Sequence, residues 1–493
     1  MDLLGGTTII LIACLALLVA WKTAGAKKKN LPPGPTPLPF VGNLFQVISN
    51  NLSECLRKMS EIYGPVFTVY FGSERVVIVC GYDLVKKVLL DNGEDFLDRG
   101  RMPSADKGSK AFGVVASNGE RWQQIRRFSL TTLRDFGMGK KSIEERIQEE
   151  AEYLMKELRA TKGRPFNPTT LYSSATCNTI SHILFAERFD YQDEDYTRML
   201  KLLTEVFVLD SSYGGQFYYL LPELMDFLPG PHKALFKNWS HIVNFVGRNV
   251  DEHKKTLDPT SVPRDFVDSF LLKMEQEKSN PKTEFTTENL MATIVDIFTA
   301  GTETTSSTLR YLHMIMAERQ DVQAKVHEEI DRVIGRERPP AMKDRPELPY
   351  TEAVIHETQR FLDLLPVGLA RRTRRDVELG GFTIPKGTTV HPLLSSAMQD
   401  PKQFKKPYKF DPGHFLDEKG NFKKNGADVP FSAGKRNCLG EGLARMELFL
   451  YATTILQSFH IKLPPGVSNI DLGPKVSGFG KMPHDAELCF CPR

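Results

Sequence analysis

The chain has 493 residues, of which 41% are hydrophobic and 25% charged, so it can bury a sizeable core and wholesale disorder is excluded. Its 64 basic and 61 acidic side chains give a net charge of +3, which is too small to indicate a nucleic-acid partner. The seven cysteines form no C-x-x-C pair, so neither a zinc site nor a dithiol redox site is indicated. All except Cys438 are expected to be free thiols in a reducing compartment.

Residues 1–21 are predicted to form a transmembrane anchor. No charged side chain occurs from Leu3 to Trp21, and this stretch approaches the roughly 20 residues that a helix needs to cross a hydrocarbon core. Lysines follow the segment, while Asp2 is the only charge before it, which places the rest of the chain on the cytosolic side. The alternative is a signal peptide cleaved after 24–26, but such peptides carry their positive charge ahead of the apolar run.

A basic and proline-rich hinge is predicted at residues 22–40. Within it, 31–39 contains five prolines, and proline-rich segments are stiff, extended and unable to continue a helix. The segment is therefore expected to act as a rigid spacer that holds a globular domain close to a membrane.

Residues 41–493 are predicted to form one large domain, mainly α-helical with a minor β-sheet region. Periodicity of 3.6 residues predicts most of it as helix, whereas alternation and β-branched residues predict a few strands. The clearest helices are expected at 143–158, 288–320 and 321–334, and the strands at 66–71, 75–79 and within 377–390. No phosphate-binding loop occurs, and 440–445 lacks the third glycine of a dinucleotide-binding pattern.

The segment Phe431-Ser-Ala-Gly-Lys-Arg-Asn-Cys438-Leu-Gly440 carries the most chemical information. Its two glycines permit tight turns and a close backbone approach to a ligand. Cys438 comes just before an apolar helical pattern, and a thiolate beside a helix N-terminus is stabilised by the helix dipole and free amides. Arg436 could pair with an anion, so a large planar cofactor that carries carboxylates would suit this loop.

This segment resembles the F-x-x-G-x-R-x-C-x-G haem loop of the cytochrome P-450 family at every specified position. The resemblance extends over essentially the whole chain, and the proline hinge and 178–191 are similar to the microsomal family-two branch. It implies the cytochrome P-450 fold and haem b, with Cys438 as the thiolate ligand of the iron and Arg436 on a haem propionate. A thiolate ligand favours O–O bond cleavage.

The segment Ala300-Gly-Thr-Glu-Thr-Thr305 interrupts a long helical pattern, because glycine beside hydroxyl residues is a poor helix interior. Read alone, it could be a surface turn. It also resembles the oxygen-binding motif of the family, which implies that Thr304 kinks the helix beside the haem and hydrogen-bonds dioxygen. By the same resemblance Glu303 helps to pass protons inward, and both are predicted to be catalytic.

Glu357 and Arg360 are three residues apart and so share a helix face. Alone they predict an ordinary helix salt bridge. Beside the cysteine loop they resemble the E-x-x-R pair of the family, which is structural. Its usual partner segment is 410–415, where Gly413 replaces a more usual acidic residue and leaves the third partnership open, while His414 suits the basic position.

Other motifs imply contacts with the haem propionates. Trp122 and Arg126 resemble the W-x-x-x-R motif, and Arg99 and Arg371 match further propionate contacts, although any single arginine could be a solvated charge. Ala370 stands where relatives usually have proline, so the backbone before Arg371 is expected to differ slightly.

A substrate pocket is implied by resemblance, and most of its residues are apolar, as a lipophilic site requires. Asp296 could pair with a cation there, or it could cap backbone amides, which is the structural role we favour. The predicted lining is Val115, Ala116, Phe207, Asp296, Ile297, Thr299, Ala300, Leu365, Val367, Leu369 and Phe479.

The resemblance implies a monooxygenase that inserts one atom of dioxygen into a lipophilic small molecule such as a drug, steroid or fatty acid. Because no flavin or nicotinamide motif occurs, electrons are expected from NADPH-cytochrome P-450 reductase, and in some cases from a b-type cytochrome. The expected location is the endoplasmic reticulum membrane, with a single span and a cytosolic catalytic domain. The alternatives are a haem-thiolate isomerase, a peroxide-driven enzyme, or a non-catalytic haem-binding sensor.

Overall fold

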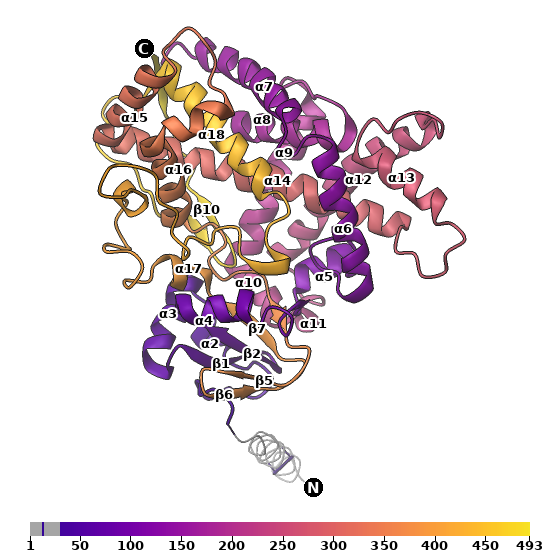
Figure 1. The fold of residues 1–493 in the computed structure, drawn as a ribbon. Coiled ribbons are helices and arrows are strands. Elements are labelled where there is room, and N and C mark those ends of the chain that lie inside the picture. The colour runs from indigo at the N-terminus through magenta and orange to yellow at the C-terminus, as the bar shows by residue number, and fades with distance from the viewer. Residues whose placement is uncertain (1–11, 14–29) are drawn as a thin grey trace.

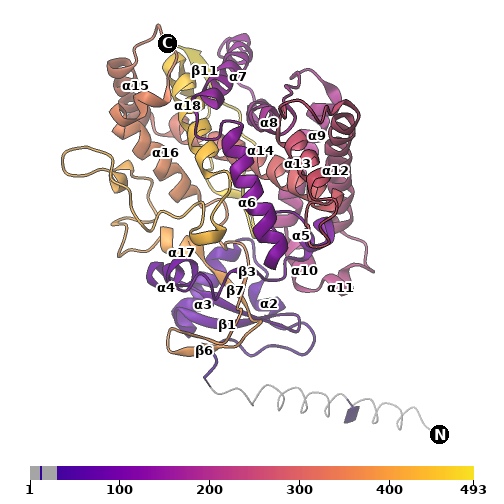
Figure 2. The same cartoon turned by 45° about the vertical axis from the view of Figure 1, so that its right-hand side comes forward.

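The β-branched segments early in the chain form the sheet expected from their alternation. In the computed structural model, which describes residues 12–13 and 30–493, β1 (Val66–Phe71) pairs antiparallel with β2 (Glu74–Val79). The sheet is completed by strands from much later in the chain, in the order β1-β2-β7-β4-β3. Here β7 (Thr389–Pro392) lies parallel to β2, and β4 (Arg371–Arg372) joins it to β3 (Asp98–Arg99). This sheet lies at one end of the molecule in both Figure 1 and Figure 2.

The rest of the described chain is mainly helical, as expected, and the three strongest predictions of helices are confirmed to within two residues. These helices are α7 (Lys141–Ala160), α14 (Thr287–Glu318) and α15 (Gln320–Val333). The other long helices are α3 (Leu52–Tyr63), α6 (Gly119–Asp135), α8 (Thr169–Phe185), α9 (Glu194–Ser211), α12 (Pro231–Thr256), α13 (Phe266–Gln276), α16 (Pro349–Leu362) and α18 (Glu441–Ser458).

Shorter elements complete the described part of the fold. The short helices are α2 (Leu44–Val47), α4 (Tyr82–Lys86), α5 (Pro103–Ser109), α10 (Tyr213–Leu220), α11 (Pro222–Met225) and α17 (Leu394–Met398). Two-stranded sheets pair β5 (Val377–Leu379) with β6 (Phe382–Ile384), β8 (Phe459–Lys462) with β11 (Cys489–Pro492), and β9 (Pro474–Ser477) with β10 (Lys481–Pro483).

Helix α14 runs through the centre of the helical part, beside α8 and α18 (Figure 2). Its 32 residues make it about 48 Å long, and it is not interrupted at 300–305. The hydroxyl groups there bond back into the helix: Thr302 Oγ1 donates to Phe298 O, and Thr304 Oγ1 to Ala300 O, both at 2.7 Å. Gly301 lies where α8 packs closely, since a Cβ there would be 3.3 Å from Ile180. Tertiary packing thus overrides the poor local helix propensity.

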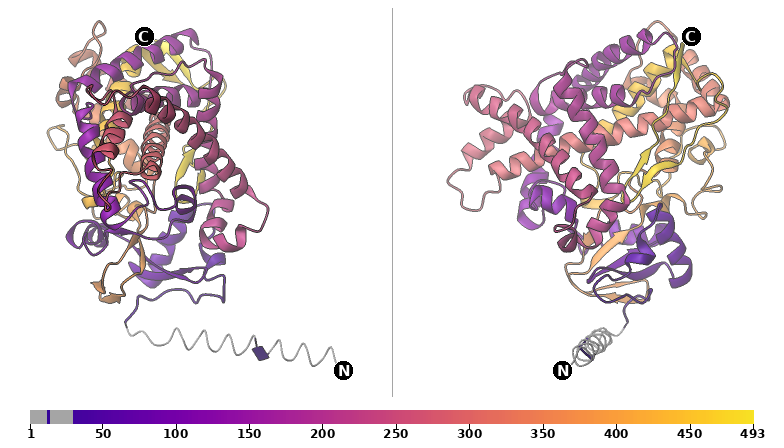
Figure 3. Two further views of the ribbon diagram at one scale, coloured as in Figure 1. Left: turned by 90° about the vertical axis from the view of Figure 1, so that its right-hand side faces the viewer. Right: turned by 180° about the vertical axis from the view of Figure 1, so that it is seen from behind.

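The predicted anchor lies outside the described residues, apart from Ile12 and Ala13. Among the described residues, the helices are all too short or too polar to cross a membrane. The views of Figure 3 show the helical part and the sheet from two further sides, with the sheet again at one end.

The proline-rich segment lies against the sheet in an extended conformation. Thr68 in β1 donates its backbone N–H to Pro33 O at 2.7 Å and its hydroxyl to Pro32 O at 2.9 Å. Gly34 passes so close that a Cβ would lie 1.8 Å from Thr68 O, which is backbone and cannot move aside. The end of the predicted spacer is therefore bonded to the domain.

Gly34→Ala is expected to displace this segment from β1 and to lower the free energy of unfolding by roughly 1–3 kcal/mol, as overpacking commonly does. Chemical denaturation followed by circular dichroism measures the change. Gly247→Ala, inside α12, is the matched control, because a Cβ there meets only Met291 at 3.6 Å and alanine is the better helix former. Equal stability of the two variants would contradict the close contact at Gly34.

Candidate functional site

The loop before α18 is shaped by close contacts that only glycine permits. Gly434 has a φ of +75°, and a Cβ on it would lie 2.0 Å from Leu89 O. The loop closes where the Cys438 N–H donates to Phe431 O at 2.9 Å. Burial raises the pKa of the Cys438 thiol, while the backbone N–H groups of Gly440 and Glu441 at the start of α18 lower it. These amides would stabilise a thiolate, as the sequence predicts.

Cys438 faces a cavity that separates this loop from α14. On the α14 side the cavity is lined by Ala300, Gly301, Thr304 and Thr305, and on the loop side by residues that include Phe431 and Cys438. The lining is mostly apolar. Cys438 on the loop side and Thr304 on the α14 side are thus among the residues that could contact a group bound in this space.

Four arginines form a cluster beside this cavity, and three of them, Arg99, Arg126 and Arg436, line it. Arg99 and Arg371 are paired across β3 and β4, Arg126 comes from α6, and Arg436 from the cysteine loop. Burial and the neighbouring cations lower the pKa of Arg371 to about 10 and that of Arg436 to about 9, and they lower the pKa of Arg99 far below its usual value. Buried charges are normally paired, so this cluster requires an anion.

Several donors in the cluster are buried without a partner among the described residues: Trp122 Nε1, Arg371 Nε and Arg436 Nη1. The ring of Trp122 lies under the Arg436 guanidinium, 3.9 Å from its centroid, and Trp122 and Arg126 share one face of α6 as predicted. Buried donors without acceptors are rare in proteins and call for an explanation. The carboxylates of a planar cofactor would supply acceptors and negative charge, so these residues fit haem.

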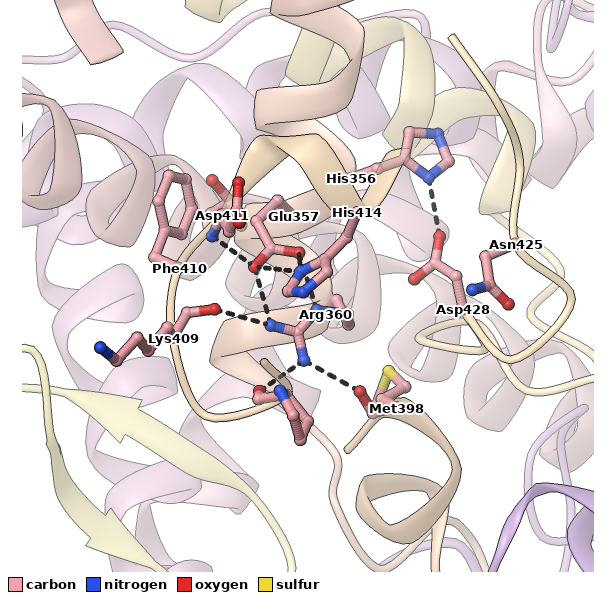
Figure 4. A network of polar contacts seen from close by, with 12 residues as sticks. His356, Glu357, Arg360, Met398, Lys409, Phe410, Asp411, His414, Asn425 and Asp428 are labelled. Atoms are coloured by element: carbon pink, nitrogen blue, oxygen red, sulfur yellow. Dashed lines mark hydrogen bonds and ion pairs between the residues drawn. The ribbon is translucent and has the colours of Figure 1, made fainter. Parts of the chain in front are cut away.

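The Glu357–Arg360 pair lies in α16, entirely buried, with two hydrogen bonds of 2.7 Å (Figure 4). Arg360 also donates to the carbonyl groups of Met398, Pro407 and Lys409. The third partnership, left open because of Gly413, is made by His414, whose Nδ1 lies 3.2 Å from Glu357 Oε2. The pair is thus more than an ordinary helix salt bridge, because it joins α16 to the segment that leads toward the cysteine loop.

The two residues predicted to be catalytic occupy different surroundings. Thr304 lines the cavity. Glu303 is buried on another side of α14, where its carboxylate accepts hydrogen bonds from Thr204 at 2.8 Å and Ser307 at 3.1 Å. Burial raises the pKa of Glu303. Glu303 does not line the cavity, so a proton that it passes to Thr304 would need further carriers.

Six of the predicted pocket residues line the cavity: Val115, Asp296, Ile297, Ala300, Leu365 and Leu369. The other five, Ala116, Phe207, Thr299, Val367 and Phe479, do not line it. Val367 and Ala116 are packed in small cores near the sheet, and the Phe479 ring packs against Tyr219 in a tilted arrangement with centroids 4.0 Å apart. The sequence could not separate these five residues from the six that line the cavity, because spacing along the chain does not determine tertiary contacts.

Asp296 has the structural role favoured from the sequence. Its Oδ2 accepts the N–H groups of Val114 and Val115, both at 2.9 Å. Burial raises its pKa to about 7, against the opposing effect of these two bonds.

Two residues at the site were not identified from the sequence. Glu447 on α18 is buried and lines the cavity, and burial raises its pKa well above the usual value. A carboxylate inside the apolar run 446–452 was the available signal. Asn437 accepts two hydrogen bonds from Arg126 Nη2, both at 2.8 Å, and so ties the loop to α6.

These features define a haem-thiolate protein: a cysteine loop facing a central helix across a cavity, with buried arginines at its edge. Comparison with known proteins agrees. The sequence model described as "Cytochrome P450" matches residues 32–490. Cytochrome P450 2C11 of Rattus norvegicus is 50% identical over 484 residues, covering 98% of this chain and 96% of that protein.

Two further relatives extend the similarity. Cytochrome P450 2A13 of Homo sapiens is 49% identical over 488 residues, covering 98% of each chain. Cytochrome P450 2H2 of Gallus gallus is 48% identical over 495 residues, covering each chain completely. The chain belongs to the cytochrome P450 family, close to its family-two branch, and is a monooxygenase that uses haem with a cysteine thiolate ligand.

We propose Cys438 as that ligand. Cys438→Ser is expected to abolish catalysis and the strongly red-shifted Soret band of the reduced, carbon-monoxide-bound protein, because a thiolate donates more electron density to iron than a hydroxyl does. Cys177→Ser, at a buried cysteine far along the chain from the loop, is the control and should keep the band. The red-shifted band in Cys438→Ser would exclude the assignment.

Proposed function

We propose that the chain inserts one oxygen atom of dioxygen into a lipophilic small molecule, using NADPH electrons delivered by a separate reductase. The observation that supports this most directly is the mostly apolar cavity between Thr304 and Cys438. Haem, when bound there, supplies the oxygen chemistry. The described residues around it bind an apolar molecule, exclude water and place one hydroxyl at the reacting centre.

Thr304 is the residue that we propose to deliver protons. Its hydroxyl donates to Ala300 O, which leaves its lone pairs free toward the cavity. Reduction of dioxygen to water needs protons in a dry pocket, and a hydroxyl can accept one proton and donate another. Burial raises the pKa of Glu303, which favours its protonated form, and we propose Glu303 as the earlier donor, acting through further carriers.

Thr304→Ala is expected to retain haem and substrate binding but to release much of the consumed oxygen as hydrogen peroxide. Positioned proton donors typically contribute about 10²–10⁴-fold to such steps. Product and peroxide formed per NADPH measure the effect. Thr302→Ala is the matched control, because the Thr302 hydroxyl makes the same type of bond within α14, to Phe298 O, and Thr302 does not line the cavity. Unchanged product per NADPH in Thr304→Ala would exclude the role.

The alternatives differ in their need for electrons. An isomerase or a peroxide-driven enzyme would form product without NADPH, and a sensor would form none. The Thr304 hydroxyl at the cavity favours dioxygen activation over all three. A screen of lipophilic compounds with reductase present, read by product mass and NADPH consumption, distinguishes them.

The electron donor is proposed to dock on the basic surface near the cysteine loop, and a b-type cytochrome would use the same surface. Of the basic residues adjacent to the motifs, Lys435 is paired with Glu94, and Lys140 and Lys141 lie 3.9 and 3.8 Å from carboxylates. Within the described chain, no ion pair is found for Arg127, Arg134, Lys423 or Lys424, all of which are exposed. These four are the strongest candidates, since both proposed donors are acidic.

Reversing Arg127 and Arg134 to glutamate is expected to slow reduction by the reductase several-fold at low ionic strength and to leave substrate affinity unchanged. Complementary charge mainly raises association rates and is screened by salt. Stopped-flow reduction at several salt concentrations measures this. The same change at Lys201 and Lys237, on α9 and α12, is the control, and equal rates in both variants would exclude the docking surface.

We also propose that 1–21 anchors the chain in the endoplasmic reticulum membrane, that 22–40 connects it, and that 41–493 forms the catalytic domain on the cytosolic side. Two glycosylation sequons allow a test, but they differ in accessibility. Asn238 is buried and donates to Glu205 at 2.9 Å, so it would stay unmodified on either side. Asn51 is exposed.

Asn51 is therefore expected to carry no glycan when the chain is expressed in eukaryotic cells, because the glycosylation machinery lies in the lumen. Mass after glycosidase treatment measures this. An N-terminal extension with an added sequon is the control and should be modified, since the anchor places that end in the lumen. Glycan on Asn51 would reverse the proposed topology.

A further inference from the structure

Two residues at the start of the cysteine loop contact charged side chains of neighbouring helices. Phe431 opens the loop, and its carbonyl oxygen accepts the Cys438 N–H. Asp428 precedes it by three residues and is buried. Both contact one group of charged side chains from α16 and α18, none of which takes part in the haem site described above.

Arg445 on α18 is the centre of this group. Its guanidinium lies over the Phe431 ring, 4.8 Å from the centroid. Its Nε donates to Glu441 Oε1 at 3.0 Å, and its Nη1 lies 2.9 Å from His356 Nε2. The Arg445 side chain is only 14% exposed, so these three contacts hold the guanidinium plane in one orientation.

His356 on α16 joins Arg445 to Asp428. It is buried, and its Nδ1 lies 2.7 Å from Asp428 Oδ2 (Figure 4). Its Nε2 also lies 3.1 Å from Glu352 Oε1, and Glu352 is itself paired with Arg345. Asp428 accepts at Nδ1, so in the neutral imidazole the proton is on Nδ1 and Nε2 accepts from Arg445. Burial lowers the pKa of His356, but its hydrogen bonds with Asp428 and Glu352 raise it overall, and in the imidazolium Nε2 donates to Glu352 and contacts Arg445 without accepting from it.

We propose that Arg445 is a positioning residue for the iron ligand, acting through the ring of Phe431, and that His356 holds both Arg445 and Asp428 in place. The ring and the carbonyl that bonds the Cys438 amide belong to the same residue. A contact that restrains the ring therefore also restrains the backbone of Phe431, whose carbonyl accepts the Cys438 amide. A cation over a partly desolvated aromatic ring is held more strongly than one at an exposed site, so the contact favours one conformation of the loop.

Arg445 could instead act only as a surface cation for a redox partner, or only as a general stabiliser. Three readouts separate these roles. Reduction with dithionite requires no partner protein, so any spectral effect there excludes a pure docking role. A control arginine with similar packing separates local from general stability, and a double-mutant cycle tests the path through Phe431.

The experiment compares Arg445→Met with Arg188→Met at equal haem content. Arg188 also lies over aromatic rings, 3.5 Å from Tyr153 and 5.1 Å from Tyr191, and pairs with a buried carboxylate, but it contacts α7 and not the loop. After dithionite reduction and carbon monoxide addition, Arg445→Met is expected to lose the thiolate-type Soret band about tenfold faster than wild type, a change equivalent to about 1.4 kcal/mol. Arg188→Met should match wild type.

Arg445→Lys keeps the charge but loses the planar guanidinium, so its band should decay at a rate between those of wild type and Arg445→Met. This variant also tests the proposal if Arg445→Met fails to fold. In the cycle, Arg445→Met should add little to Phe431→Leu, because both remove one contact. His356→Asn, which retains a donor toward Asp428, should show the same effect as Arg445→Met to a smaller degree. Wild-type decay in Arg445→Met, equal decay in Arg188→Met, or additive effects in the cycle would overturn the proposal.

Discussion

The buried ion pair between Glu357 and Arg360 is the contact on which the arrangement of the haem side depends. Both side chains are fully removed from solvent, and such a pair is stable only if the remaining hydrogen-bonding capacity is satisfied. Here the carbonyls of Met398, Pro407 and Lys409 and the imidazole of His414 complete it. A largely irregular segment, in which Pro412–Phe415 forms a short 3-10 helix, is thereby given a fixed path toward Cys438.

The arginine cluster links the stability of the haem site to the bound cofactor. Arg99, Arg371 and Arg436 are buried close together: Arg371 lowers the pKa of both Arg99 and Arg436, and Arg436 lowers that of Arg99. Without an anion, their mutual repulsion and the unpartnered donors oppose the packing of β3, β4 and the cysteine loop. Binding of a dianionic group removes both costs, so cofactor binding and local folding are linked.

Much of the site could be predicted because motif spacing determines it. The cysteine loop, the Trp122–Arg126 face and the Glu357–Arg360 face each depend on neighbours within one loop or one helical turn, and the structure brings them together as expected. The continuity of α14 through Gly301 was not predicted, because it depends on packing against Ile180. Pocket residues such as Phe479 depend on contacts between segments hundreds of residues apart, which periodicity cannot reveal. Glu447 was not predicted, because an apolar helix pattern does not indicate that its one carboxylate faces a cavity.

The topology of the main sheet has a consequence for synthesis of the chain. Strand β2 has β7 as its parallel neighbour, and Val76 pairs with Thr389, so more than 300 residues must be made before this edge is covered. Until then the valine-rich β1–β2 hairpin presents an open hydrogen-bonding edge to other chains. Arg371 also lies in the late part of the sheet, so the cofactor site is assembled only after that edge has closed. The ribosome-bound chain therefore has a long interval in which its N-terminal hairpin needs protection from aggregation.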